Sequence, residues 1–321
     1  MNTDDRPRLL MPSAGRKVAL MRQLEQCFRV YPCGFAPAHT ASCCLAAQGR
    51  FVEQPRGMDF SQYVGWMTDT CRRIPIDAVL PVRDGDMDWL NAMRGQFETM
   101  EVPLILSPAR TIRIARDKLL MSKQLQGLAP RTVPVSEWAS LDHDFPLFAK
   151  ERQGAGSRVA QKVHTPRELG AMAIEHEDLI VQPWLSGCEY TVDLFYPASG
   201  SRASSCCRRR ISVSEGQMDC GEVVPMPEPV IESLMEVDAL LDLFGPVNMQ
   251  FIVDGDGKAW LTDINLRFGG GTPLSIRAGL DSVRRLANMI LGEDRHPTGD
   301  PIATGTRAIS YIEYIFKEPE R

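Results

Sequence analysis

Residues 251–271 read FIVDGDGKAWLTDINLRFGGG, and this stretch decides how the rest of the chain is interpreted. Two largely apolar runs lie on either side of Asp256-Gly257, a dipeptide typical of two-residue hairpin turns. We therefore expect two antiparallel strands joined at that turn, with Gly255 paired to Lys258. A turn at Asp254-Gly255 is the alternative, and it would change the alignment of the two strands. The second strand carries polar residues and leads into three consecutive glycines, which an ordinary hairpin does not require.

The expected register places polar side chains on one face of the hairpin. Gln250 falls opposite Asp263, and Asn248 falls opposite Asn265. Side chains alternate between the two faces of a strand, so these residues project to the same side. One carboxylate with amide oxygens suits Mg²⁺, which keeps part of its water shell and shares the phosphates of a substrate. The hairpin therefore predicts a magnesium–nucleotide site, and a polar face that is merely solvated is the alternative.

A cation and a glycine cluster follow the second strand. Arg267 lies two residues after Asn265 and on the same face, where it can neutralise charge that develops in a phosphoryl or tetrahedral transition state. Gly269, Gly270 and Gly271 allow the backbone to approach a ligand and expose N–H groups near the start of the next helix, a good place for a carboxylate or phosphate. A flexible connection is the alternative explanation of the glycines.

The composition is that of an acidic globular chain. Its 321 residues are 44% hydrophobic and 24% charged, with a net charge of -5, so the chain can bury a core in more than one lobe. It lacks the general basic field that nucleic-acid binding requires. The one local basic run, Arg208 to Arg210, has no interleaved aromatic residues and is typical of a solvated strand edge. We expect no nucleic-acid partner.

The cysteines and the N-terminal residues predict the cellular compartment. None of the nine cysteines shows the C-x-x-C spacing of a zinc or redox motif, so they are best explained as thiols in a reducing compartment. The opening MNTDDRPRLLMPSAGRK has acidic residues before a short apolar run, which fits neither a secretory signal nor a membrane span. We expect a cytoplasmic protein with no membrane partner.

The first hundred residues alternate short apolar runs with longer amphipathic stretches, which is typical of parallel βαβ units. The expected strands are RLLMPSAG, DAVLPV and VPLILS, and the expected helices are RKVALMRQLEQCF and DMDWLNAMRGQF. Ser13-Ala14-Gly15 lies between a strand and a helix, where backbone N–H groups can hold an anion. It lacks the G-x-G-x-x-G pattern of dinucleotide sites, so a plain tight turn is equally compatible.

The pattern changes after residues 109–127, which predict one long amphipathic helix. PLFAKERQGAGSRVAQKVHT predicts a strand, a glycine-bearing loop and a second strand, followed by a helix from Arg167 and the strand LIVQPWL. Further on, EYTVDLFY and TRAISYIEYIF predict strands, and PVIESLMEVDALLDLFG and LSIRAGLDSVRRLANMILG predict helices. These segments predict antiparallel strands with helices.

The order of these motifs resembles that of the ATP-grasp superfamily, particularly the carbamoyl-phosphate-synthetase-like members that join a carboxylate to an amine. LMPSAGRKVALMRQL and VLPVRDGDMDWL are similar to parts of their pre-ATP-grasp domains, and IARDKLLMSKQL is similar to the entry of their nucleotide-binding part. LFAKERQGAGSR resembles their K-P-x-x-G-x-G-S strand and loop, and IVQPWLSGCEYTVDLF resembles their adenine hinge and ribose acid. VNMQFIVDGDGKAWLTDINLRFGGG resembles the metal hairpin usually written Q…E-I-N-P-R-F-G-G-G.

The resemblance covers essentially the whole chain and implies an α/β protein with the ATP-grasp fold. A pre-ATP-grasp α/β domain with a parallel sheet would occupy residues 1–108. A linker helix and a small α+β lid would occupy residues 109–181. An antiparallel C-terminal subdomain with the metal hairpin would occupy residues 182–321.

The resemblance also implies roles for individual residues. ATP phosphates or the base would be held by Lys118 and Lys150, and the lid loop would contribute Gly154, Gly156 and Ser157. The adenine edge and the ribose hydroxyls would be read by Gln182, Pro183, Leu185 and Glu189. Magnesium would be bound by Gln250, Asp263 and Asn265. Arg267 would act at the acyl-phosphate step, Gly269, Gly270 and Gly271 would bind substrate, and Arg210 would meet the phosphates or the acyl group, with Arg208 and Arg209 as alternatives.

The implied activity is that of an ATP-dependent carboxylate–amine ligase that forms an amide or peptide bond through an acyl phosphate and releases ADP and phosphate. The substrates would be a small carboxylate and an amine, amino acids among them, in peptide or natural-product biosynthesis. The cofactors would be ATP and two magnesium ions, for which Mn²⁺ can substitute, and a homodimer is the usual assembly of the family.

The sequence departs from the family pattern at three positions. Asp263 stands where Glu is usual, Glu151 follows the phosphate lysine where Pro is usual, and Leu266 stands where Pro is common. Two alternatives therefore stay open. One is a carbamoyl-phosphate-type enzyme or carboxylate kinase that releases its phosphorylated product, and the other is a non-catalytic nucleotide-binding protein.

Overall fold

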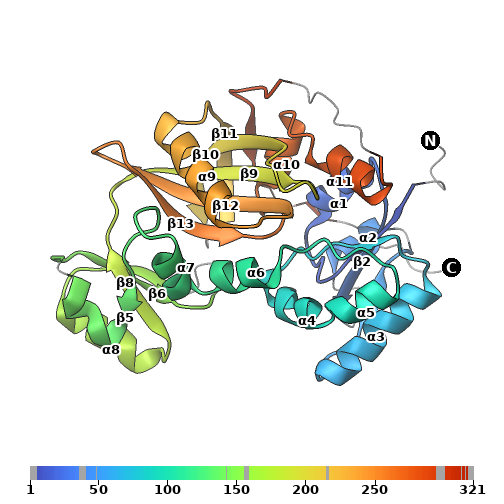
Figure 1. The fold of residues 1–321 in the computed structure, drawn as a ribbon, viewed down its shortest axis with the longest axis horizontal. Coiled ribbons are helices and arrows are strands. Elements are labelled where there is room, and N and C mark those ends of the chain that lie inside the picture. The colour runs from blue at the N-terminus through green and yellow to red at the C-terminus, as the bar shows by residue number, and fades with distance from the viewer. Residues whose placement is uncertain are drawn as a thin grey trace.

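The computed structural model describes residues 6–35, 41–47, 49–141, 143–154, 159–214, 217–293, 301–311, 313–314 and 316. Its strands form three sheets (Figure 1). The N-terminal sheet and a small lobe lie toward opposite ends of the long axis, and a larger sheet lies beside the helices that connect them. Among the described residues, none of the helices combines the length and apolar composition needed to cross a bilayer.

The N-terminal lobe is built around a parallel four-stranded sheet of order β3-β2-β1-β4. Its strands are β1 (Arg8–Met11), β2 (Arg29–Phe35), β3 (Val52–Gln54) and β4 (Ala78–Val79), and its helices are α1 (Val18–Leu24), α2 (Ser42–Ala46), α3 (Phe60–Arg73), α4 (Met87–Ala92) and α5 (Arg94–Thr99). Helix α3 begins with a capping box between Asp59 and Gln62. The strand expected at VPLILS is reduced to one parallel bridge between Leu104 and Val79.

The single helix expected over residues 109–127 is two helices, α6 (Ala109–Arg116) and α7 (Lys118–Gln124). Asp117 separates them in an extended conformation, and its carboxylate accepts hydrogen bonds from the backbone N–H groups of Leu119 and Leu120. A side chain that caps the second helix in this way stabilises a break that apolar periodicity does not reveal. Asp117 also pairs with Arg152 at 2.6 Å, so the break is tied to the small lobe.

The small lobe is an antiparallel sheet of order β5-β8-β6-β7 with one α-helix. Its elements are β5 (Val133–Pro134), β6 (Leu147–Glu151), β7 (Ala160–Val163), α8 (Pro166–Glu175) and β8 (Leu179–Pro183). Leu147, Ala149 and Val181 are fully buried in its core. Ala149 points into that core, so its neighbours Phe148 and Lys150 point to the opposite face of the sheet. That face contributes an aromatic and a charged side chain to the site.

The largest sheet has six antiparallel strands in the order β13-β12-β9-β10-β11-β14. They are β9 (Gly187–Tyr196), β10 (Ser204–Ser214), β11 (Gln217–Val223), β12 (Gly245–Asp254), β13 (Ala259–Asn265) and β14 (Arg307–Ile309). Helix α9 (Glu228–Leu240) packs against β12 and β13 (Figure 1). Met249 and Phe251 belong to the same apolar cluster as that helix. The intervening Gln250 therefore faces the opposite side of the sheet.

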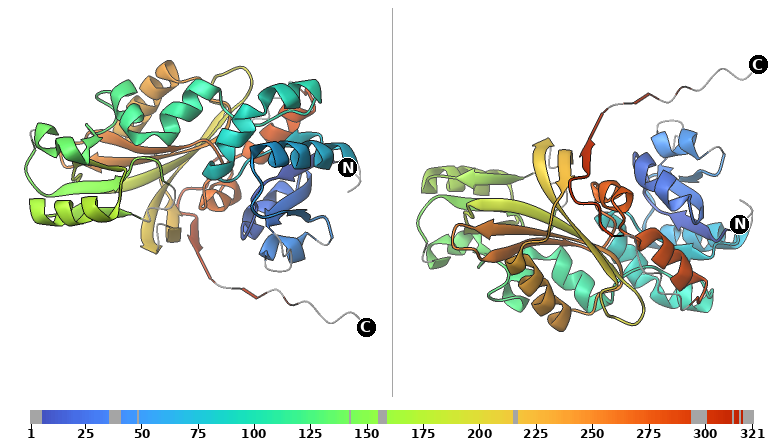
Figure 2. Two further views of the ribbon diagram at one scale, coloured as in Figure 1. Left: turned by 90° about the horizontal axis from the view of Figure 1, so that it is seen from below. Right: turned by 90° about the horizontal axis from the view of Figure 1, so that it is seen from above.

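The C-terminal part also differs from the sequence expectation. LSIRAGLDSVRRLANMILG forms two helices, α10 (Thr272–Arg277) and α11 (Ser282–Ile290), because Gly279 adopts a φ of 114°, which breaks the helical path. Among the described residues of the last expected strand, Arg307–Ile309 is the part that pairs, with β11. In both views of Figure 2 the described residues that follow β14 lead away from the sheets.

The hairpin of β12 and β13, called the metal-type hairpin below, pairs Gln250 with Asp263 and Asn248 with Asn265 as expected, but its turn differs from the expected one. The turn lies between Asp254 and Lys258, so the expected pairing of Gly255 with Lys258 was wrong. Near the turn Phe251 pairs with Leu261, whereas Gln250 pairs with Asp263. A one-residue irregularity between these pairs restores the alignment of the polar residues.

Candidate active site

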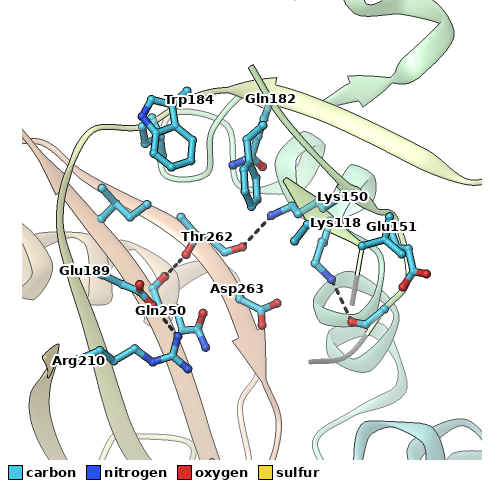
Figure 3. Close-up of a pocket in the computed structure, with 16 residues that line it drawn as sticks. Lys118, Lys150, Glu151, Gln182, Trp184, Glu189, Arg210, Gln250, Thr262 and Asp263 are labelled. Carbon is cyan, nitrogen blue, oxygen red and sulfur yellow. Dashed lines mark hydrogen bonds and ion pairs between the residues drawn. The ribbon is translucent and has the colours of Figure 1, made fainter. Parts of the chain in front are cut away.

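A cavity of about 370 Å³ lies between the small lobe and the six-stranded sheet (Figure 3). It is lined by Lys118, Phe148, Lys150, Glu151, Gly154, Val159, Ala160, Gln182, Trp184, Leu185, Glu189, Arg210, Gln250, Ile252, Thr262 and Asp263. Both its volume and its mixture of apolar walls with a few charged groups are typical of small-molecule sites. Most of the residues that the sequence singled out for nucleotide and metal binding thus line one cavity.

The hinge side of the cavity is apolar and aromatic. Gln182 is buried at the end of β8, and Trp184 and Leu185 follow it into the lining, while Pro183 ends the strand. The rings of Trp184 and Phe148 lie with centroids 5.8 Å apart. Sequence reasoning did not single out either aromatic residue, although Phe148 lies two residues before Lys150 and shares its strand face. This wall offers a flat apolar surface of the kind that a purine base needs.

The structure distinguishes the three consecutive arginines by what they pack against. Arg210 lines the cavity and pairs with Glu189 at 2.9 Å, and Figure 3 shows the two side chains meeting between β9 and β10. Arg208 is buried beside Asp193, and Arg209 is exposed. Arg210 is therefore the arginine of the three that the structure brings to the nucleotide-sized cavity.

Two lysines face the cavity near each other, and the Nζ of Lys150 lies 5.8 Å from the centroid of the Phe148 ring. Lys150 is buried and its Nζ donates to the carbonyl oxygen of Thr262 at 3.4 Å, whereas the Nζ of Lys118 donates to the carbonyl oxygen of Gly154 at 3.3 Å (Figure 3). Burial, together with the neighbouring Lys118 charge, lowers the pKa of Lys150 to about 8, against an opposing effect of Asp263. Gly156 and Ser157, the other expected loop residues, lie outside the described residues.

For the nucleotide binding that the sequence predicts, this pKa implies a dependence on pH. Anionic phosphates favour the charged form of Lys150, so binding takes up a proton wherever the free protein has a neutral Lys150. At saturating magnesium, ADP affinity is expected to fall above about pH 8, by up to about tenfold per pH unit. Lys150→Arg keeps its charge over this range, so its ADP affinity should vary much less with pH. Calorimetric dissociation constants measured from pH 7 upward test this, and equal pH slopes in both proteins would contradict it.

The proposed metal ligands lie side by side at the boundary of the cavity. Gln250 and Asp263 are register partners on β12 and β13 and lie beside one another in Figure 3. Asn265 is near, because its Nδ2 donates to Asp263 Oδ2 at 3.0 Å. Within the described residues no group of three His, Cys, Asp or Glu side chains forms a potential metal site. A single carboxylate with amide oxygens nevertheless fits a magnesium ion that takes its other ligands from water and phosphate.

Arg267 connects this hairpin to the N-terminal lobe. Its Nε and Nη2 form a bidentate pair with Asp84, with the closest contact at 2.5 Å, and its Nη2 also donates to Asn265 Oδ1 at 3.0 Å. Both members of the ion pair are more than four-fifths buried. Asp84 was not singled out from the sequence, because nothing local indicates that it meets a residue 183 positions away. The pair fixes the guanidinium between the two lobes.

The glycine cluster has a packing role next to a buried polar network. The Asp193 carboxylate accepts hydrogen bonds from Arg208 Nε at 2.9 Å, Asn248 Nδ2 at 2.7 Å, Thr272 Oγ1 at 2.7 Å and Ser275 Oγ at 2.6 Å. Arg208 and Asn248, in turn, lie where side chains on the cluster would project. A Cβ on Gly269 would lie 2.8 Å from Asn248 Nδ2, and one on Gly271 would lie 2.5 Å from Arg208 Nη1. These two positions therefore exclude any side chain, whatever Gly269, Gly270 and Gly271 bind.

This geometry predicts different effects for two neighbouring substitutions. Gly271→Ala should lower the free energy of unfolding by about 1–3 kcal/mol, because the new methyl group must displace a buried guanidinium. Gly270→Ala is the matched control, because a Cβ there meets nothing within 4 Å. Urea unfolding of both variants measures the difference. Equal stabilities would show that Arg208 can move without cost.

A second cavity of about 330 Å³ adjoins the first on the side away from the hinge. It is lined by Arg83, Asp84, Gly85, Ala115, Arg116, Lys118, Glu151, Gln153, Gly154, Asp263, Ile264 and Asn265. Four of these residues, Lys118, Glu151, Gly154 and Asp263, also line the first cavity. The two cavities therefore share the wall where the lysines and the metal-type hairpin meet.

Comparison with known proteins agrees with this architecture. Residues 175–311 match a family model described as ATP-grasp in the biosynthetic pathway with Ter operon. No curated protein matches the sequence.

Solved structures resemble the chain over most of its length. An L-amino acid ligase from Bacillus licheniformis is 15% identical with a TM-score of 0.68, and the match covers 91% of this chain and 77% of that one. N5-carboxyaminoimidazole synthetase from Staphylococcus aureus, in complex with ADP, is 11% identical with a TM-score of 0.70 and coverages of 92% and 80%. The biotin carboxylase domain of Hydrogenobacter thermophilus 2-oxoglutarate carboxylase, in complex with MgADP and bicarbonate, is 14% identical with a TM-score of 0.68 and coverages of 89% and 70%. The similarity to these proteins shows a common fold of three lobes.

Proposed function

We propose that the chain is an ATP-dependent ligase that joins a small carboxylate to an amine. The match of residues 175–311 to an ATP-grasp family model and the ATP-grasp fold of the chain support this proposal. The proposal includes an acyl-phosphate intermediate and the release of ADP and phosphate. The description of the matching family refers to a biosynthetic pathway, and we extend that role to this chain. The similarity to an L-amino acid ligase supports amino acids as the substrate class.

ATP would lie in the first cavity with its base at the hinge and its phosphates at the lysines. The apolar wall of Trp184 and Phe148 suits the purine, and the buried Gln182 lies next to the backbone of Pro183 and Leu185 that would read its edge. Glu189, about two-fifths exposed, is the carboxylate placed to accept hydrogen bonds from ribose hydroxyls. Its partner Arg210 holds it in place.

The phosphate end would supply charge neutralisation. Lys118 and Lys150 face it from α7 and β6. Magnesium bound by Gln250, Asp263 and Asn265 would neutralise the β- and γ-phosphates and hold them for in-line transfer. Most of the rate acceleration in phosphoryl transfer comes from such positioning and electrostatic stabilisation.

The carboxylate would attack the γ-phosphorus at the wall shared by the two cavities. Arg267 lines neither cavity itself but stands beside Asn265, which lines the second, and Asp84 holds its guanidinium plane fixed. A preorganised cation stabilises developing charge without reorganisation during the reaction. The amine would then displace phosphate from the acyl phosphate, with the small lobe limiting the access of water to that intermediate.

The observation that carries the proposal is the meeting of the two lysines with Gln250 and Asp263 in a cavity that also has an aromatic wall. The test is ADP and phosphate release from Mg-ATP across pooled amino acids and small carboxylates, with mass spectrometry of the pools. We expect ADP rather than AMP, release that requires two substrates, and a new amide mass.

The same experiment separates the alternatives. ADP release that needs a carboxylate but no amine would indicate a carboxylate kinase or a carbamoyl-phosphate-type enzyme. Tight Mg-ATP binding without stimulated release by any pool would favour a non-catalytic nucleotide-binding protein. Absence of Mg-ATP binding would reject the proposal altogether.

A further inference from the structure

The second cavity contains two charged side chains that the proposed reaction does not use. Arg83 follows β4, and Glu151 ends β6, so the two come from different lobes. Within the part of the chain that the structure describes, neither forms an ion pair. The cavity volume of about 330 Å³ lies within the range of small-molecule sites.

The other charged groups of this cavity are already engaged. Arg116 pairs with Asp88 at 3.0 Å and donates to the carbonyl oxygen of Asp84 at 2.8 Å, and the Asp84 carboxylate pairs with Arg267. Lys118 and Asp263 belong to the phosphate and metal end. Arg83 and Glu151 therefore present one positive and one negative charge for a ligand.

We propose that this cavity binds a free α-amino acid, with its ammonium group at Glu151 and its carboxylate at Arg83. This inference rests on the proposed ligase function, and it names the amine substrate of that reaction. A zwitterion matches the two charges, and charge-assisted hydrogen bonds to both ends would provide affinity and orientation. A simple amine or a simple monocarboxylate would leave one of the two groups unmatched.

The position of the two residues also fixes the direction in which the amino acid binds. Glu151 lines both cavities, whereas Arg83 lines only the second. In Figure 3 the Glu151 carboxylate lies on the side of Lys118 away from Asp263. The amino group therefore faces the nucleotide and the carboxylate faces the N-terminal lobe, so the amino acid is the acyl acceptor rather than the acyl donor.

This orientation gives a balanced reaction. The amino nitrogen bonds to the acyl carbon, and the bond from that carbon to the phosphate oxygen breaks with its electron pair, which leaves with phosphate. The two protons that the nitrogen loses between ammonium and amide pass to water. The role also explains why Glu151 stands next to Lys150, where the superfamily pattern usually has proline.

The test measures amino-acid binding to the full chain in the presence of magnesium and a non-hydrolysable ATP analogue. Each of the twenty standard L-amino acids is titrated by calorimetry, and any amino acid that binds is compared with its N-acetyl derivative and its carboxamide. We expect at least one to bind, and each derivative to bind about 10- to 100-fold more weakly, because each loses one charge-assisted contact.

Two variants assign the contacts. Arg83→Ala should weaken binding of the amino acid about 10- to 100-fold but change binding of its carboxamide little. Glu151→Gln should weaken binding of the amino acid but change binding of its N-acetyl derivative little. Arg113→Ala on α6 and Glu175→Gln on α8 are matched controls, because both side chains are exposed and line neither cavity. Nucleotide affinity is measured for every variant, and Arg83→Ala should leave it unchanged.

The outcomes distinguish this inference from the proposed function. If the nucleotide analogue does not bind, both are wrong. If it binds but none of the twenty amino acids does, the amino-acid site is wrong and the ligase proposal stands. Equal effects of Arg83→Ala and Arg113→Ala, or undiminished binding of the N-acetyl derivative, would also overturn it.

Discussion

Asp263→Ala is expected to lower the rate of magnesium-dependent ADP release by about 100- to 1000-fold, which is the effect of removing a preorganised group that stabilises transition-state charge. Asp263 is the carboxylate of the proposed ligand set, because Gln250 and Asn265 are neutral amides. Without it, two amides remain to hold a strongly hydrated cation that favours anionic oxygen ligands. The substrate-dependent ADP assay measures the rate, and a titration of ATP with and without magnesium measures the metal dependence of binding.

The control for this prediction lies on the same hairpin. Asp256 is exposed at the turn, and its removal changes the net charge by the same amount as Asp263→Ala. Asp256→Ala should therefore retain nearly the full rate. If both variants are equally active, or if ATP binds to Asp263→Ala with an undiminished magnesium dependence, the metal assignment of the hairpin is wrong.

Asp193→Ala is expected to lower the free energy of unfolding by about 3–5 kcal/mol, which is typical for breaking a buried ion pair by removing one partner. Asp193 and Arg208 are 1% and 2% exposed. The substitution would leave the charge of Arg208 buried without its anionic partner. It would also remove the acceptor of the hydrogen bonds that Asn248, Thr272 and Ser275 donate. Urea unfolding at neutral pH measures the loss, with Asp242→Ala, at an exposed position, as the control.

The same carboxylate predicts a loss of stability in acid. Burial alone would raise the pKa of Asp193, but the Arg208 charge and the hydrogen bonds from Arg208, Ser275 and Thr272 outweigh it and lower the pKa. A depressed folded-state pKa contributes stability above the unfolded value of about 3.9, and that contribution disappears as the pH falls through the folded value. Unfolding free energies measured from pH 5 downward should fall more steeply for the wild-type protein than for Asp193→Asn, and parallel curves would contradict this.

The sequence alone determined the elements that depend on local patterns. Alternation along a strand placed Asp263 and Asn265 on one face, and the order of five motifs predicted the ATP-grasp fold. Phe148 lies two residues before Lys150 and therefore on the same face of its strand. The sequence thus also indicated that Phe148 lines the cavity, although this was not recognised. Each of these features is specified within a few neighbouring residues, since the direction of a side chain follows from the period of its strand.

The tertiary structure decided the features that depend on contacts between distant segments. Asp117 ends a helix because its carboxylate caps the next one and pairs with a residue of another lobe, and a one-residue irregularity, not the expected turn, aligns the hairpin. Packing between strands selected Arg210 for the cavity and buried Arg208. The pair of Arg267 with Asp84 joins residues 183 positions apart. Arg83 and Glu151 likewise share a cavity only because two lobes meet there, since periodicity specifies a face within one element but not which faces of distant elements pack together.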